Sequence, residues 1–172
     1  MTEIDTDTLF NYVEANNAQE LQDALKHQKV DPNCTNSEGC CLLHDACKLG
    51  TLKCVKALTK DPGTNVNAVG PGRLTPIFLE MQYDKMNCFN ILQEHSDIDF
   101  KFQNQEGQTI IRFTKSLFKS RYGKDDVDHV KSLSTFPVTN HASNNELLKN
   151  IDIYRTIEIF TVIHIADTYS KP

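Results

Sequence analysis

A period of 34 residues runs through most of this chain of 172 residues and constrains its fold more than any other feature. Periods of about 20 to 50 residues are typical of solenoids, in which each unit is too thin to bury its apolar face alone and stacks on its neighbours. Four units of 34 residues account for 136 of the 172. The matching columns include Leu9, Leu43, Ile77 and Ile111; Asn16, Gly50 and Asp84; Leu21, Val55 and Phe89; Asp31, Asn65 and Asp99; and Asn36, Gly70 and Asn104.

One unit contains two short helical patterns separated by a turn. An apolar residue opens the first pattern, and Gly50 follows where a residue in the left-handed conformation would end a helix. Leu52, Val55 and Leu58 then lie three residues apart, as on one face of a second helix. Stretches with Pro and Gly, such as 61–63, close the unit as a loop. The sequence therefore predicts an all-α fold in which helix, turn, helix and extended turn repeat.

The period divides the chain into a repeat domain and a remainder. We expect the repeat domain to cover residues 1–136, with the last unit degenerate because Phe118 stands where a turn residue is expected. The remainder, 137–172, is expected to be a helical segment that caps the stack or binds a partner. The expected units lie near 4–36, 37–70, 71–104 and 105–136.

The Ile-rich segment 146–169 within that remainder has two interpretations. Its isoleucines lie at odd positions, which favours a strand. Leu147, Ile151 and Tyr154, preceded by a capping Ser or Asn, favour a helix. We favour the helix because the end of a helical solenoid offers a helical surface to cover, and the strand remains open.

Three stretches carry a resemblance to a known family. They are Gly39-Cys40-Cys41-Leu42-Leu43-His44-Asp45-Ala46-Cys47-Lys48-Leu49-Gly50, Thr75-Pro76-Ile77-Phe78 and Gly107-Gln108-Thr109-Ile110-Ile111. They resemble the ankyrin repeat, whose signature is Thr-Pro-Leu-His-x-Ala. The resemblance covers about residues 4–124 and implies an ankyrin-repeat solenoid. It also implies that His44 ties one repeat's turn to the next, that Cys41 replaces a capping Thr, and that Cys47 replaces a small buried residue.

The resemblance also marks one position that departs from the family. Glu80 stands where an ankyrin unit has a small buried residue. A carboxylate there would need a partner or access to solvent. We expect either a local distortion of the third unit or a Glu80 side chain that reaches the rim.

A concave face of inner helices and turn tips is the candidate binding site that the resemblance implies. Aromatic and apolar residues exposed together on such a face usually mark binding sites. We expect Leu79, Tyr83, Phe113 and Leu117 to form an apolar patch, covered either by a protein partner or by the Ile-rich segment. The remaining candidates on the concave face are Asp45, Lys48, Leu49 and Gln82, and those at the turn tips are Arg73 and Glu106.

Composition narrows the function classes. The chain has 18 Lys and Arg against 23 Asp and Glu, a net charge of -5, which argues against a dedicated nucleic-acid binder. No apolar run reaches the ~18 residues of a membrane span, and the N-terminus lacks a signal-peptide pattern. We therefore expect an intracellular protein, cytoplasmic or nuclear, whose six cysteines are reduced thiols. No metal, cofactor or small-molecule substrate is expected.

The most favoured function is a non-catalytic protein–protein interaction module that acts as a regulatory subunit or inhibitor. The chain's small size and divergent repeats are similar to those of a small stand-alone ankyrin-repeat regulator that works in a protein kinase complex, which implies control of the cell cycle and of DNA replication. One alternative is an IκB-like inhibitor of a transcription factor. An alternative from another class is a hydrolase whose nucleophile is Cys41 or Cys47.

Overall fold

The computed structural model describes residues 4–27, 30–83 and 85–122, and confirms the all-α prediction for them: outside the helices they contain one isolated bridge, between Thr35 and Cys41. The chain divides into two compact units, Met1–Phe113 and Thr114–Pro172. The expected boundary at residue 136 and the Ile-rich segment 146–169 lie outside the described residues. The helices are α1 (Thr6–Glu14), α2 (Ala18–His27), α3 (Leu42–Leu49), α4 (Leu52–Lys60), the 3-10 turn η1 (Pro71–Arg73), α5 (Pro76–Gln82), α6 (Met86–Gln93) and α7 (Ile110–Tyr122).

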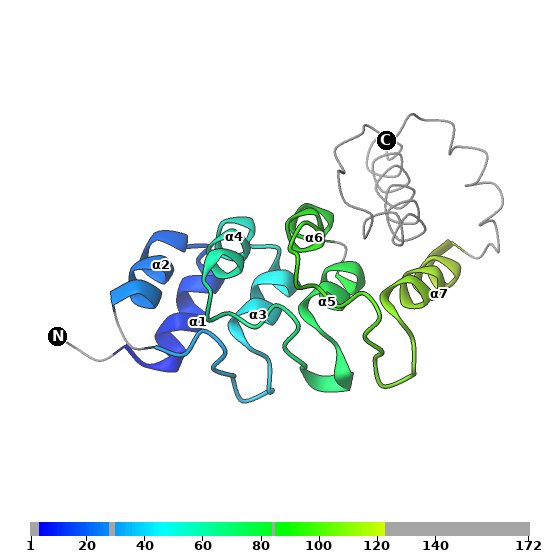
Figure 1. Cartoon of the computed structure of the whole chain (residues 1–172), viewed down its shortest axis with the longest axis horizontal. Coiled ribbons are helices and arrows are strands. Elements are labelled where there is room, and N and C mark those ends of the chain that lie inside the picture. The colour runs from blue at the N-terminus through cyan, green and yellow to red at the C-terminus, as the bar shows by residue number, and fades with distance from the viewer. Residues whose placement is uncertain (1–3, 28–29, 84, 123–172) are drawn as a thin grey trace. The chain divides into compact units, whose positions relative to one another are not determined.

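Within the compact part Met1–Phe113, the helices form pairs that stack in two layers. The first helices of the pairs, α1, α3 and α5, lie side by side, and so do the second helices, α2, α4 and α6 (Figure 1). The second helices begin at Ala18, Leu52 and Met86, which are 34 residues apart. Their matching apolar side chains are fully buried between the layers because neither layer could remove them from water alone. These core residues include Leu21, Val55 and Phe89, and Ala24, Leu58 and Leu92.

The turn between the two helices of a pair depends on a left-handed residue. Asn16 has φ 51° and Gly50 has φ 74°, one period apart. Asn and Gly tolerate this conformation better than other residues, which explains why helices α1 and α3 end there. The prediction of a left-handed turn is confirmed at both positions, while Asp84, the third member of the column, lies outside the described residues.

The loops that join successive pairs end in a tight turn with the same backbone pattern each time. The N–H groups of Asn36, Gly70 and Asn104 donate to carbonyl oxygens four residues on, at 2.9, 2.9 and 3.0 Å. A left-handed residue follows three positions after each of them: Gly39, Arg73 and Gly107. Arg73 has φ 54°, a conformation in which non-glycine residues are uncommon. Residues 38–39, 72–73 and 106–107 thus lie at equivalent turn tips, with side chains at Glu38, Arg73 and Glu106.

One asparagine connects each loop to the next, and two such links are present in the described residues. Asn33 Nδ2 donates to the Gly63 carbonyl (2.8 Å), and its Oδ1 accepts from the Asn65 N–H (2.7 Å). One period later Asn67 bonds in the same way to the Asp97 carbonyl (2.6 Å) and to the Asp99 N–H (2.9 Å). Each side chain therefore replaces two backbone partners that a sheet would have supplied, and holds neighbouring loops in register.

Removing one of these side chains should weaken the stack. We expect Asn67→Ala to lower the free energy of unfolding by about 1 kcal/mol, because two partly solvated hydrogen bonds are replaced by bonds to water. Urea unfolding followed by circular dichroism measures the change. Asn67→Asp keeps the acceptor but places a carboxylate oxygen against the Asp97 carbonyl oxygen, so its loss should be at least as large. Equal stability of Asn67→Ala and wild type would contradict the structural role of this link.

The fourth unit departs from the pattern of the first three. Helix α7 runs without interruption from Ile110 to Tyr122 and passes through Phe118, which is the equivalent of Asn16 and Gly50. Phe has no preference for the left-handed conformation, so the helix continues where the earlier units turn. The helix-turn-helix pattern expected for 105–136 is therefore absent through Tyr122, and the rest of that unit lies outside the described residues.

Candidate partner-binding surface

His44 links the second helix pair to the loop that leads into the third pair. Its Nε2 lies 3.0 Å from the Leu74 carbonyl oxygen, which can only accept, so Nε2 carries the proton. Its Nδ1 then accepts from the Cys41 N–H (3.2 Å) and lies 3.0 Å from Cys41 Sγ. Burial lowers the pKa of His44, and its hydrogen bonds to backbone groups only partly oppose this effect. The prediction that His44 ties one unit to the next is confirmed, and the imidazole there is neutral.

The cysteines proposed as nucleophiles are buried. Cys41 is 3% exposed and Cys47 is fully buried. Burial raises the pKa of both thiols, and that of Cys47 rises well above its usual range. A reactive cysteine needs the opposite, a lowered pKa and an accessible sulfur. All six cysteines are free, and the half-buried Cys34 is the most accessible of them.

Glu80 does not reach the rim, and helix α5 continues through it without distortion, so neither expectation for this residue is correct. Its side chain is fully buried, and neither carboxyl oxygen makes a hydrogen bond to a described residue. Burial raises the pKa of Glu80 to about 9, and the neighbouring Cys47 thiol acts in the opposite direction. The carboxyl group is therefore protonated at neutral pH, because burying a charged carboxylate at this depth would cost more free energy than taking up a proton.

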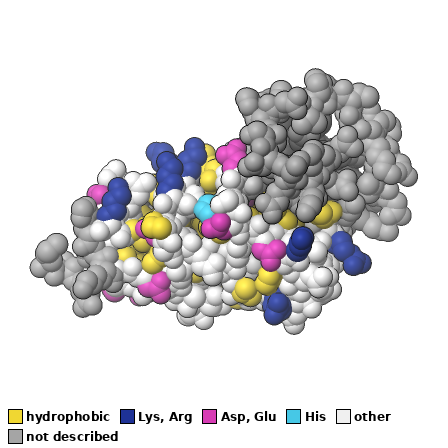
Figure 2. Space-filling model, in the orientation of Figure 1, with side chains coloured by type: hydrophobic (Ala, Val, Ile, Leu, Met, Phe, Trp, Pro, Cys, Tyr) yellow, Lys and Arg dark blue, Asp and Glu magenta, His cyan; other side chains and the backbone are white. Residues whose placement is uncertain are grey.

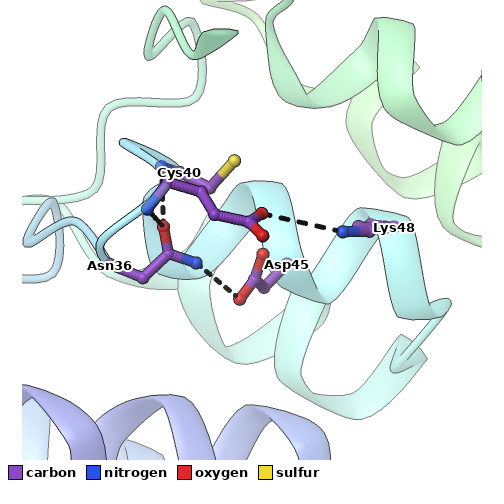
Figure 3. Close-up of polar contacts among 5 residues, drawn as sticks. Asn36, Cys40, Asp45 and Lys48 are labelled. Carbon is purple, nitrogen blue, oxygen red and sulfur yellow. Dashed lines mark hydrogen bonds and ion pairs between the residues drawn. The ribbon is translucent and has the colours of Figure 1, made fainter.

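Asp45, Lys48 and Tyr83 of the predicted site lie together on the layer of first helices. Lys48 Nζ is 3.9 Å from Glu38 Oε2 at the turn tip and 5.9 Å from the centroid of the Tyr83 ring. Asp45 Oδ2 accepts from Asn36 Nδ2 at 3.3 Å, as Figure 3 shows. Helix α3, the C-terminal end of α5 and the first turn tip thus bring charged and aromatic groups to one surface.

The pKa of Asp45 reports the charges around this surface. Burial raises its pKa, the neighbouring Glu38 and Glu14 add to the rise, and Lys48 and Asn36 oppose it. Glu38 and Glu14 therefore disfavour a negative charge on Asp45, and among the described residues Lys48 is the one cation that favours it. Asn36 itself is fixed because its Oδ1 accepts from the Glu38 and Cys40 N–H groups at 3.0 Å each (Figure 3).

The expected apolar patch is smaller than predicted. Leu79 is only 8% exposed because it packs into the core. Phe113 is half-buried, and its ring lies edge-on against Phe78 with centroids 5.2 Å apart. Leu117 is half-buried as well, whereas Tyr83 remains 42% exposed. Leu49, one period before Tyr83, is 46% exposed. The exposed apolar pair of this surface is thus Leu49, the last residue of α3, and Tyr83, which directly follows α5.

The remaining predicted residues are Gln82, Glu106 and Arg73. Gln82 and Glu106 are exposed, the latter at the third turn tip. Arg73 is exposed too, but its guanidinium lies 5.2 Å from the centroid of the Phe102 ring. Glu38 was missed by sequence reasoning, although its place between Asn36 and the left-handed Gly39 marks it as a turn-tip residue.

Helix α4 and the surroundings of Asp45 differ in charge. Helix α4 carries Lys53, Lys56 and Lys60, all exposed, and no carboxylate. Figure 2 shows dark blue side chains gathered over this helix. On the first-helix layer, the charged residues that act on Asp45 are the carboxylates Glu38 and Glu14 and the cation Lys48. A charged partner would therefore meet different potentials on the two layers.

Comparison of the sequence with family models and with curated proteins finds no relative. Within the described residues, no helix is both long and apolar enough to cross a lipid bilayer. In the same part of the chain, no group of three or more His, Cys, Asp or Glu side chains could hold a metal ion.

Proposed function

We propose that the chain is an ankyrin-repeat protein whose function is to bind another protein through its first-helix layer and turn tips. The observation that carries the proposal is the 34-residue recurrence of the turn tips, at Gly39, Arg73 and Gly107, together with the loop links at Asn33 and Asn67. A scaffold of this kind presents side chains from successive units in a fixed array.

The surface on this array has the composition of a protein interface. Tyr83 and Leu49 are large apolar side chains left exposed beside charged groups. Aromatic residues next to polar groups supply most of the binding energy in protein interfaces, while the surrounding charges set orientation and specificity. Such a surface fits a protein partner better than a small molecule, which needs a concave pocket that encloses most of its surface.

Binding at this surface would regulate the partner. We propose that the chain acts as a regulatory subunit or inhibitor, because a stack of repeats changes its partner's state by occupying a surface. A protein kinase complex of the cell cycle is the partner class that its similarity to small ankyrin regulators suggests. Addition of the purified chain to the recovered kinase should then change the rate of substrate phosphorylation.

Affinity purification from cell extract tests the binding surface. We expect Tyr83→Asp to lose the partners that the wild-type chain recovers, with at least a tenfold drop in their amount by quantitative mass spectrometry, because a charge replaces an aromatic contact. Asn87→Asp is the matched control, since it adds the same charge at an exposed position of α6. Unchanged recovery with folded Tyr83→Asp would overturn the proposed surface. The identity of the recovered protein separates a kinase subunit from an inhibitor of a transcription factor.

A further inference from the structure

The exposed apolar pair Leu49 and Tyr83 lies within a carboxylate-rich part of the first-helix layer. We call Glu14, Glu38, Asp45, Lys48, Leu49 and Tyr83 the acidic-apolar surface. Its two apolar members are 46% and 42% exposed and are one period apart, at the C-terminal ends of the neighbouring helices α3 and α5. An apolar side chain inserted between equivalent positions of two packed helices could contact both at once.

The charges around this pair are unbalanced. Glu38 is paired with Lys48 at 3.9 Å, but Lys48 also lies over the Tyr83 ring at 5.9 Å. Asp45 has Asn36 as its hydrogen-bond partner, and its neighbours Glu38 and Glu14 are both carboxylates. One lysine therefore balances three carboxylates, and the region keeps a net negative charge that an incoming cation would neutralise.

Lysines outside the acidic-apolar surface mark where this negative region ends. Lys85 lies over Gly50, at the turn that follows Leu49, where a β-carbon on Gly50 would come within 2.8 Å of its side chain. The lysines of α4 belong to the other layer. A cationic partner would therefore be attracted to the turn-tip side of Leu49 and Tyr83 and repelled from α4 and Lys85.

We propose that the acidic-apolar surface binds a lysine- or arginine-bearing segment of a protein partner, with one large apolar side chain of that segment seated on Leu49 and Tyr83. The cationic side chains lie next to Glu14, Glu38 and Asp45. This inference rests on the proposed protein-binding function and specifies the chemistry of the partner. The apolar contact supplies affinity, and the carboxylates select a basic segment over an acidic one.

Fluorescence polarisation of the full chain with short labelled peptides tests the inference. The peptides share a central Phe and flank it with Lys, Glu or Ser. We expect the Lys peptide to bind at least about tenfold more tightly than the Glu peptide, and its affinity to fall as salt rises. Equal binding of the Lys and Glu peptides, or binding of none of them, overturns the inference.

Matched variants locate the binding. Glu14→Gln/Glu38→Gln should weaken the Lys peptide by about tenfold and leave the Ser peptide unchanged. Glu20→Gln/Glu94→Gln removes the same number of exposed charges from the other helix layer and should leave both unchanged. Equal effects of the two double variants would mean that net charge alone attracts the peptide, which overturns the site.

The outcome also separates this inference from the proposed function. Suppose Tyr83→Asp loses partners from extract while Glu14→Gln/Glu38→Gln retains them. The surface then binds protein without selecting basic segments, and only the further inference fails. If Tyr83→Asp retains the partners, the proposed surface fails first.

Discussion

Replacing Glu80 by Met is expected to raise the free energy of unfolding by about 3 kcal/mol at pH 7. The fully buried carboxyl group must take up a proton on folding, because its pKa rises from 4.5 to about 9. Each pH unit between the unfolded-state pKa and the working pH costs about 1.4 kcal/mol. Met removes this cost and the unpartnered polar atoms while keeping a similar volume.

Urea unfolding at pH 7 measures the gain, and Glu20→Met is its control. Glu20 is exposed on α2, so its replacement should change stability by no more than about 0.5 kcal/mol. A destabilised Glu80→Met with an unchanged slope of the urea transition would show that the carboxyl group makes a favourable interaction in the core. The account of Glu80 as a cost would then be wrong.

The same residue predicts how stability depends on pH. Above pH 4.5 the unfolded chain releases the Glu80 proton while the folded chain keeps it until about pH 9, so stability falls as pH rises through this window. Between pH 6.5 and 8 the loss should be about 2 kcal/mol. Glu80→Gln should abolish it. A wild-type stability that is flat over this range would contradict a protonated Glu80.

Other buried groups affect stability mainly outside the interval from pH 6.5 to 8. Burial lowers the folded-state pKa of His44 below 6.5, so His44 makes the chain less stable as pH falls below that value. Burial raises the pKa of the Cys47 and Cys88 thiols, that of Cys88 to about 12, so they lower stability when the unfolded thiols ionise near pH 9. Between the two limits Glu80 dominates.

Replacing His44 by Ala is expected to cost about 3 kcal/mol of stability. The change leaves the Cys41 N–H without its partner in a buried site, removes the bond to the Leu74 carbonyl, and creates a cavity. Thermal and urea unfolding of the variant measure the loss. A cost below about 1 kcal/mol would mean that water replaces both hydrogen bonds, and the imidazole would then not be a structural link.

Gly70→Ala tests the same link without removing a hydrogen-bonding group. A β-carbon at Gly70 would lie 2.9 Å from His44 Nε2, and the ring has no room to move because both nitrogens are engaged. We expect a loss of about 1 to 2 kcal/mol. Gly63→Ala is the control, because its β-carbon would meet only the end of the Asp61 side chain and the Pro32 ring.

The parts of this fold that the sequence predicted are those that local chemistry decides. Helices α2, α4 and α6 begin one period apart because the apolar spacing in each repeats, and Asn16 and Gly50 end helices because they tolerate a left-handed backbone. Phe118 signalled the missing turn in the fourth unit for the same reason. The role of His44 followed from its place in a signature that recurs in stacked repeats.

The parts that the sequence could not decide depend on contacts between units. Leu79 was expected on the surface and is buried, and Phe113 is half covered because Phe78 of the neighbouring helix lies against it. Glu80 is the clearest example, because the sequence left open that its side chain reaches solvent, whereas the structure buries it fully. The bonds of Asn33 and Asn67 span 30 or 32 residues, and the one sequence clue to them was the separation of the two asparagines by one period.

The sequence by itself determined the all-α class, the 34-residue interval and the residues that end each helix, since these depend on spacing and backbone preference within a few residues. The tertiary structure decided which side chains stay exposed, and therefore that the candidate surface consists of Leu49, Tyr83 and the charges around Lys48. Exposure depends on the size and position of side chains in the adjacent units, and an interval of matching residues does not specify either.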